Sequence, residues 1–356
     1  MQYLIESQLI LEYTLHRTCV GGNKGIQKDL DDGIDTIGKK MTVCQLYAKQ
    51  IRHRGNVRYN TKNGRKRLMK LLEEDKLGGC PIDSVKLSDA KEWAIRMKEK
   101  GISYKTISND KRSLKAAFYT AIQDDCIRKN PFDFQLNTVI EDDTEPKVPL
   151  TPAQEESFLS FAQNDKVYQK YYDELIILLG TGLRISELCG LTDTDINFEN
   201  RIINVDHQLL RSAETGYYIE TPKTKSGIRQ IPMSEKVYEA FNRVLKRRRG
   251  AKAVTIDGYS NFLFLNRDGY PKTATNYDGM FRGHAKKYNK YHEEALPKVM
   301  TPHTLRHTFC TNMANAGMNP KALQYITGHS NITMTLNYYA HTTSETSITE
   351  MKRLIA

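Results

Sequence analysis

The chain has 356 residues, of which 39% are hydrophobic and 27% charged, and this suits two or three soluble globular domains. No apolar stretch is long enough to span a membrane, and the first residues lack the basic start and cleavage site of a signal peptide. The formal net charge of +11 favours a polyanionic partner such as nucleic acid, although a basic surface can also serve solubility alone. The six cysteines form no CxxC pair, so we expect reduced thiols in a cytoplasm.

The first 140 residues predict a small helical domain after an irregular start. Residues 1–23 show no clear periodicity, and the segment that follows is polar with a short helical pattern. Four helical patterns come next, at residues 42–55, 60–79, 88–101 and 103–130. Thr42 and Ser88 are the expected N-cap residues of the first and third of these helices. The many Lys and Arg residues favour phosphate tracking slightly over an ordinary solvated surface.

A second domain is expected after the acidic and proline-containing stretch 141–150, which has the composition of a linker. Thr151 is the predicted N-cap of its first helix, with Pro152 at the first helical position. "YYDELIILLGTGLRISELCGL" predicts a buried helix, a break and a second helix. "RIINVDHQLL" and "GYYIETPKTKSGIRQIPMS" predict short strands and a hairpin, and the remainder is mainly helical.

A metal site is not predicted, although His303 and His307 have the i, i+4 spacing of zinc ligands on a helix. Thr304 follows His303, where a metalloprotease needs a glutamate. No carboxylate or cysteine cluster offers a third ligand. We therefore expect neither a metal nor a cofactor.

Phosphate is a better candidate ligand for the same helix. His303 and Arg306 are three residues apart and share a face, so an imidazole and a guanidinium could hold two oxygens of one phosphodiester. Arg184 follows Gly182 at the start of a helix, where backbone N–H groups favour an anion, and Glu187 lies one turn on to orient it. The alternatives are a packed histidine beside a surface arginine, and a surface ion pair.

Two further stretches carry groups that could react. Lys223 and Lys225 lie in the predicted hairpin with Gly227 near its tip, and a lysine there could protonate a leaving oxygen. Tyr338 and Tyr339 follow "GHS" by about ten residues, and a tyrosine hydroxyl can attack phosphorus to give a covalent 3′-phosphotyrosyl bond. Such a bond conserves the phosphodiester energy, so rejoining needs no ATP. Taken alone, these residues are more often solvated lysines and packed tyrosines.

Together the motifs "TGLRISELCGL", "PKTKSGIRQIP", "TPHTLRHTFCTNMANAG" and "YITGHSNITMTLNYYAH" have the order and spacing of the tyrosine recombinases, the phage integrase family. The resemblance covers about residues 42–356 and is closest to integrases of Tn916-like conjugative transposons. It implies a mainly α fold with a small β-sheet. A helical SAM-like core-binding domain (42–140) and a mixed α/β, type IB topoisomerase-like catalytic domain (151–356) would lie on opposite sides of DNA. Residues 1–41 would be a truncated or rearranged arm-binding region and linker.

The resemblance also assigns roles around a scissile phosphate. Two arginines grip it, two histidines hydrogen-bond it and assist proton transfer, a lysine protonates the 5′ oxygen, and an acidic residue supports the first arginine. The two arginines are Arg184 and Arg306, and the two histidines are His303 and His329. The lysine is Lys223, with Lys225 as the alternative, and the acidic residue is Glu187.

The nucleophile is one of two adjacent tyrosines. A gap-free register from His329 favours Tyr338, whereas a Tyr-x-His pattern would favour Tyr339. His307 is then expected to be a buried or supporting residue.

The expected function is site-specific cleavage and rejoining of double-stranded DNA for integration and excision of a mobile element. The alternatives are a Xer-like dimer resolvase and a catalytically decayed DNA-binding homologue. We expect a homotetramer on DNA in the bacterial cytoplasm, an excisionase or DNA-bending accessory protein, and no membrane association. The C-terminal tail would dock on a neighbouring subunit through Met351, Leu354 and Ile355, or else pack on its own domain.

Overall fold

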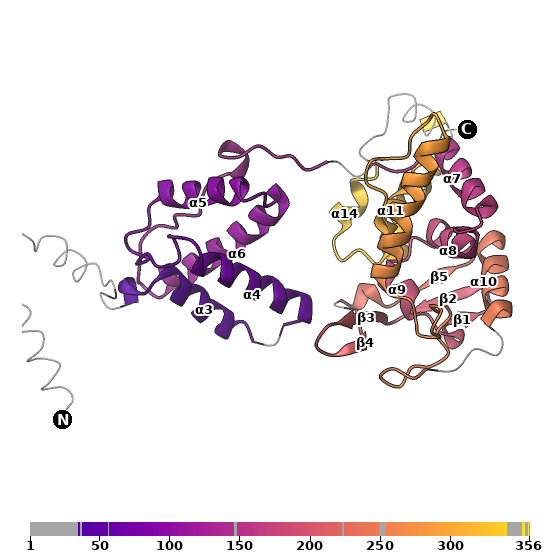
Figure 1. Ribbon diagram of the computed structural model, residues 1–356, viewed down its shortest axis with the longest axis horizontal. Coiled ribbons are helices and arrows are strands. Elements are labelled where there is room, and N and C mark those ends of the chain that lie inside the picture. The colour runs from indigo at the N-terminus through magenta and orange to yellow at the C-terminus, as the bar shows by residue number, and fades with distance from the viewer. Residues whose placement is uncertain are drawn as a thin grey trace, which may run out of the picture. The chain divides into compact units, whose positions relative to one another are not determined.

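The computed structural model describes residues 35, 38–55, 57–145, 148–222, 224–248, 254–339, 351, 352 and 355 (Figure 1). The expected arm-binding region lies almost entirely outside these residues, and so do Lys223 and Leu354. The chain divides into two compact units, Met1–Glu145 and Pro146–Ala356. Among the described residues, no helix is long and apolar enough to cross a membrane.

The first unit contains helices α3 (Val43–His53), α4 (Tyr59–Glu73), α5 (Leu87–Glu99) and α6 (Tyr104–Gln123). Thr42 caps α3 as predicted. Its side-chain oxygen accepts a hydrogen bond from the Gln45 N–H, and the Gln45 side-chain oxygen accepts one from the Thr42 N–H. The prediction of Ser88 as N-cap was wrong. Helix α5 begins at Leu87, two residues earlier than a Ser88 cap would give, because the Asp89 carboxylate accepts the Lys86 N–H at 2.8 Å.

The core of this unit gathers around Trp93, whose side chain is wholly buried. Its ring meets Phe132 edge-on at 5.7 Å between centroids, and Phe118 packs on the same phenyl ring. Leu68 and Leu72 bring α4 onto this core, as their spacing predicts. Exposed lysines and arginines therefore remain on the outer faces of the helices.

The second unit combines helices with two small antiparallel sheets (Figure 1). Its helices are α7 (Pro152–Asn164), α8 (Tyr172–Thr181), α9 (Ile185–Gly190), α10 (Glu235–Arg248), α11 (Ala274–Tyr291), α12 (Pro302–Asn315), α13 (Pro320–Thr327) and α14 (Ile332–Leu336). Its strands are β1 (Ile196–Asn197), β2 (Ile202–Val205), β3 (Gln208–Ser212), β4 (Gly216–Glu220) and β5 (Arg229–Pro232). One sheet has the order β1-β2-β5 and the other pairs β3 with β4. The chain is thus mainly helical with small sheets, as predicted.

The strand pairing differs from the predicted hairpin around Gly227. Strand β4 pairs with β3, placing Leu210 opposite Tyr218, whereas β5 pairs with β2, placing Val205 opposite Arg229. Strands β4 and β5 therefore belong to different sheets and do not form a hairpin with each other. Pro222 lacks the N–H that a paired strand needs, and a 3-10 turn follows at Lys225–Gly227.

The break between α8 and α9 fixes the geometry that the site requires. Gly182 ends α8 with φ +63°, a conformation that favours glycine. A Cβ atom on Gly182 would lie 2.4 Å from the Phe309 ring of α12, so the absence of a side chain allows these segments to approach. Around this break, Leu175, Leu178 and Leu183 are fully buried.

Candidate active site

Arg184 occupies the N-cap position of α9, directly after the glycine break. Its Nη1 donates to Glu187 Oε1 at 2.7 Å, and its backbone N–H donates to Glu187 Oε2 at 2.8 Å. Its Nη2 donates to the Gly328 carbonyl oxygen at 2.9 Å, across 144 residues of sequence. The predicted Arg184–Glu187 contact is present. The side chain keeps 33% exposure, so the guanidinium still reaches solvent.

Glu187 is buried and accepts from two arginines. In addition to Arg184, Arg229 on β5 donates to both of its carboxylate oxygens, at 3.0 and 2.8 Å. Burial alone would raise the pKa of Glu187, but hydrogen bonds and charge from Arg229, with help from Arg184, lower it to about 2. Glu187 is therefore ionised at neutral pH.

Arg306 lies on α12 and is 5% exposed. Its two terminal nitrogens donate to main-chain oxygens, Nη1 to Gly182 at 2.5 Å and Nη2 to Thr327 at 2.5 Å. Burial and then the neighbouring charge of Arg184 lower the pKa of Arg306 to about 10. The guanidinium still carries its charge at neutral pH, and its orientation is set by backbone on both sides.

His329 follows Gly328, which ends α13 with φ +64°. Its Nδ1 lies 3.1 Å from Thr327 Oγ1 and 2.9 Å from Thr335 Oγ1. Burial, followed by the charges of Arg306 and Arg184, lowers the pKa of His329 to about 4. The imidazole is therefore neutral at pH 7 and can donate a hydrogen bond through one nitrogen only.

Tyr338 lies against this group. Its ring is parallel to the imidazole of His329 at 6.3 Å between centroids and edge-on to His307 at 4.8 Å. Burial, with a contribution from the adjacent Cys310 thiol, raises the pKa of Tyr338 to about 12. Tyr339 points elsewhere, because its hydroxyl donates to the Met318 carbonyl oxygen at 2.5 Å.

The other predicted residues lie as follows. His303 is exposed on the first turn of α12, one turn before Arg306. Lys223 lies outside the described residues, whereas Lys225 belongs to the 3-10 turn that precedes β5. Arg229 was not singled out from the sequence, because a lone arginine in a strand pattern gives no sign of its partner.

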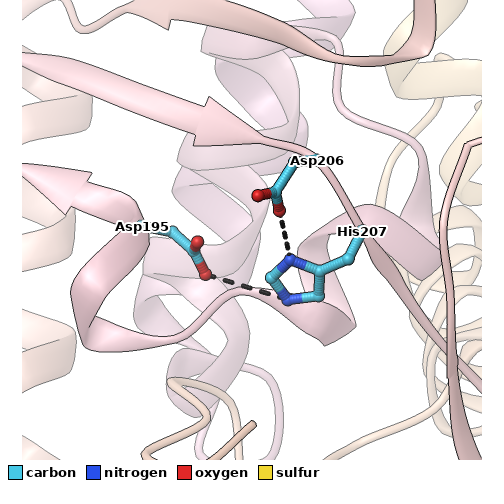
Figure 2. Close-up of side chains that lie close together, drawn as sticks. All are labelled: Asp195, Asp206 and His207. Atoms are coloured by element: carbon cyan, nitrogen blue, oxygen red, sulfur yellow. Dashed lines mark hydrogen bonds and ion pairs between the residues drawn. The ribbon is translucent and has the colours of Figure 1, made fainter. Parts of the chain in front are cut away.

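A separate cluster brings together Asp195, which directly precedes β1, and Asp206 and His207, which lie between β2 and β3 (Figure 2). His207 Nδ1 faces Asp206 Oδ1 at 2.5 Å, and Nε2 faces the Gly190 carbonyl oxygen at 2.7 Å. Both ring nitrogens are therefore already engaged by oxygen atoms within the protein. Asp195 Oδ2 is also used, accepting from the N–H and the hydroxyl of Thr192 at 2.7 Å each. The cluster is a hydrogen-bonded support for the end of α9.

The described network can therefore bind an anion and offers a nucleophile. Arg184, Arg306, His329 and Tyr338 come from the N-cap of α9, from α12 and from both sides of α14, and converge near Gly328 and Thr327. Glu187 is the carboxylate of this network, and both of its oxygens are bonded to arginines. Such a site suits stabilisation of a phosphate during attack by a hydroxyl.

Comparison with known proteins agrees with this chemistry. The family model described as "Phage integrase family" matches residues 149–346. The transposase from transposon Tn916 of Enterococcus faecalis is 67% identical over 329 residues, covering 92% of this chain and 81% of that protein. The tyrosine recombinase XerA of Pyrococcus furiosus is 30% identical over 280 residues, covering 76% and 79% of the two chains.

Solved structures extend the similarity to the fold. The Tn1549 transposon integrase in complex with a circular intermediate DNA matches with a TM-score of 0.85 and 76% identity, covering 88% of this chain and 99% of that chain. A lambda integrase dimer bound to a core site matches with a TM-score of 0.60 at 15% identity, covering 92% and 84%, which supports the fold alone. The chain belongs to the phage integrase family of tyrosine recombinases.

Proposed function

We propose that this chain is a site-specific recombinase that cleaves and rejoins double-stranded DNA to integrate and excise a Tn916-like conjugative transposon. The observation that carries the proposal is the network joining Arg184, Arg306, His329 and Tyr338 around one turn, in a chain 67% identical to a transposon transposase. Related structures contain transposon right end DNA and circular intermediate DNA, which supports the same class of partner here.

In the proposed reaction the Tyr338 hydroxyl oxygen attacks the scissile phosphorus, and the bond from phosphorus to the 5′ oxygen breaks. The tyrosine proton must leave during the attack, because a pKa of about 12 keeps the hydroxyl protonated at neutral pH, and His303 or His329 accepts it as a proton-transfer group. The departing 5′ oxygen gains a proton, for which the resemblance points to Lys223, with Lys225 as the alternative. Rejoining is the reverse attack by a 5′ hydroxyl, and it needs no ATP.

Electrostatics favour the pentavalent transition state. Arg184 and Arg306 supply two guanidiniums, and Glu187 is already shared between two arginines. The depressed pKa values of Arg306 and His329, after the effect of burial, reflect the positive potential that neighbouring arginines create. A phosphate entering this potential is stabilised, and its extra negative charge in the transition state is stabilised more. His303 and His329 serve as hydrogen-bonding and proton-transfer groups on the same phosphate.

Tyr338 is the better candidate nucleophile for two reasons. Its ring lies beside His329 and His307, whereas the Tyr339 hydroxyl is bonded to the Met318 carbonyl. In addition, structures of the Tn1549 integrase carry an arginine-to-lysine change at its position 225 and a tyrosine-to-phenylalanine change at its position 379. These positions are 154 apart, as are Arg184 and Tyr338.

The proposed division of labour assigns residues 42–140 to core-site binding and 151–356 to catalysis, joined by the linker 141–150. Recombination of two duplexes requires four cleavages, so the working unit is a homotetramer on DNA in the bacterial cytoplasm, aided by an excisionase or DNA-bending protein. The tail that includes Met351 and Ile355 docks on a neighbouring subunit. The 59% and 71% exposure of these two side chains agrees with that proposal.

The test is covalent trapping on a nicked duplex that carries the right end of a Tn1549-type transposon. Loss of the short nicked strand after cleavage leaves a protein–DNA adduct of reduced electrophoretic mobility. We expect the adduct with the wild-type chain and with Tyr339→Phe, and its loss with Tyr338→Phe. Loss with Tyr339→Phe alone would transfer the nucleophile role to Tyr339. Binding without any adduct, while the Tn916 transposase cleaves its own right end, would favour the decayed homologue.

A further inference from the structure

Arg229 on β5 is an arginine with no exposed side-chain surface, and the assigned roles leave it unused. Its donors are engaged within the protein: Nε by the Ile326 carbonyl at 2.7 Å, Nη1 by Glu187 at 3.0 Å and the Gly227 carbonyl at 3.1 Å, and Nη2 by Glu187 at 2.8 Å. A side chain so enclosed cannot contact DNA. Any effect on recombination must pass through the groups that it holds.

Those groups belong to three segments that each lead to a proposed site residue. Glu187 lies on α9 and bonds Arg184. Ile326 is near the end of α13, three residues before His329. Gly227 ends the turn that contains Lys225. Arg229 thus joins three segments that lie 40, 99 and 139 residues apart in sequence.

The packing around Arg229 is too close to be incidental. A Cβ atom on Gly328 would lie 3.1 Å from Arg229 Nη1 and 2.9 Å from the Ser226 carbonyl oxygen. The turn at Gly328 therefore lies directly on the guanidinium. Because the Gly328 carbonyl accepts from Arg184 Nη2, the position of Arg229 also affects where that bond forms.

The charges give this link a second effect. Glu187 on its own would both orient Arg184 and neutralise it. Arg229 takes both carboxylate oxygens as a two-point ion pair, and it is the main hydrogen-bonding and charge contribution that lowers the pKa of Glu187. With Glu187 balanced by Arg229, Arg184 remains a full cation for the phosphate while its direction is still fixed.

We propose that Arg229 is a positioning residue for DNA strand cleavage, one that holds Glu187 and the Gly328 turn so that Arg184 meets the scissile phosphate with its charge intact. The inference rests on the proposed recombinase function. It adds a role for a buried side chain that touches neither DNA nor the reacting atoms.

The test uses the full chain and the nicked right-end duplex, with Arg229→Met, which removes the charge, and Arg229→Lys, which keeps it. Single-turnover cleavage should slow by about 10- to 100-fold in Arg229→Met, as for other supporting residues, and by less in Arg229→Lys. Duplex affinity should stay within about threefold. Arg243→Met is the matched control, because Arg243 is also ion-paired within this unit, to Asp173 at 2.8 Å, and should cleave at the wild-type rate.

A double-mutant cycle separates positioning from general stability. If Arg229 acts through Arg184, Arg229→Met in an Arg184→Lys background should slow cleavage by no more than about threefold. If instead Arg229→Met slows cleavage by the same factor in the Arg184→Lys background as in wild type, the inference is overturned. A methylphosphonate at the cleavage position, which has no charge for Arg184 to meet, should likewise reduce the Arg229→Met effect.

Misfolding is addressed by a second variant. Should Arg229→Met fail to fold, the Glu187→Gln/Arg229→Met pair removes both charges and is expected to fold, with slow cleavage. Wild-type cleavage by this pair would overturn the inference. If the wild-type chain itself forms no adduct, the recombinase proposal fails and this inference with it. An adduct formed equally by wild type and Arg229→Met rejects this inference alone.

Discussion

His284 on α11 is a fully buried histidine whose ring nitrogens have no hydrogen-bond partner among the described residues. Aromatic rings enclose it, with centroids of Phe158, Tyr168 and Phe161 at 4.3, 4.8 and 5.1 Å. Burial lowers the pKa of His284 to about 4. The perturbation to examine is His284→Phe, which keeps an aromatic ring in place and removes the titrating group.

The expected magnitude follows from proton linkage. The unfolded chain takes up a proton on this histidine near its ordinary pKa of 6.5, whereas the folded chain does so only near 4. The free energy of unfolding therefore falls as pH drops from about 6.5 to about 4, and the difference amounts to roughly 3 kcal/mol. His284→Phe should lack this pH-dependent loss of stability. Its free energy of unfolding, relative to that of wild type, should therefore rise steadily as the pH is lowered from about 6.5 to about 4.

Calorimetry between about pH 7.5 and pH 4.5 is the appropriate assay. Trp93 is the single tryptophan and lies in the first unit, so its fluorescence would not follow the second. The control is Phe281→Leu, a change in a buried ring of the same helix that removes no titrating group. That variant should keep the wild-type pH dependence of the free energy of unfolding. An unchanged acid sensitivity in His284→Phe would refute the reasoning.

Three further predictions concern other groups. Glu187→Gln should lower the free energy of unfolding by about 3–5 kcal/mol at pH 7, because Arg229 is left buried without a counter-charge. The contribution of the Glu187 carboxylate to stability is present above pH 4.5 and is lost as the pH falls through about 2, and urea titration at different pH values would measure it. Asp75→Asn breaks a two-point contact with Arg96 at 2.9 and 2.7 Å and should lower the free energy of unfolding by about 3 kcal/mol, measured by urea titration. Glu74→Gln removes the exposed Lys70–Glu74 pair and should lower the same free energy by under about 0.5 kcal/mol. Thr335→Val removes a hydroxyl from His329 and should slow adduct formation by about tenfold without weakening duplex binding, whereas Thr333→Val, on the exposed side of α14, should not.

Short-range features were predictable from the sequence because the interactions that fix them are local. Thr42 and Thr151 were identified as N-caps from the residues beside them, and the structure shows both side chains accepting the expected backbone N–H. The i, i+3 spacing of Arg184 and Glu187 likewise predicted a contact that is present at 2.7 Å. Ser88 was the exception, since the cap position falls two residues earlier, at Lys86, whose N–H the Asp89 carboxylate accepts.

Long-range features were not predictable in the same way. The strand pattern around Gly227 suggested a local hairpin, but the pairing of β5 with β2 depends on contacts across about 30 residues. The Arg229–Glu187 ion pair spans 42 residues and joins a strand to a helix, so nothing in either local pattern indicates it. Only folding brings these groups together, so the role of Arg229 could not be predicted from the local pattern around it.

The three arginines around Glu187 have a thermodynamic consequence for the protein without DNA. Arg184, Arg229 and Arg306 bring three positive charges near one carboxylate, and Arg306 is bonded to neutral carbonyls. These like charges repel one another, and after the larger effect of burial the charge of Arg184 helps to lower the pKa of Arg306. A phosphodiester that enters relieves this repulsion, so substrate binding and folding stability are linked through the same charges. The folded chain is thereby more stable with its substrate bound than alone. The arginines that bind the phosphate are in turn stabilised in their positions by it.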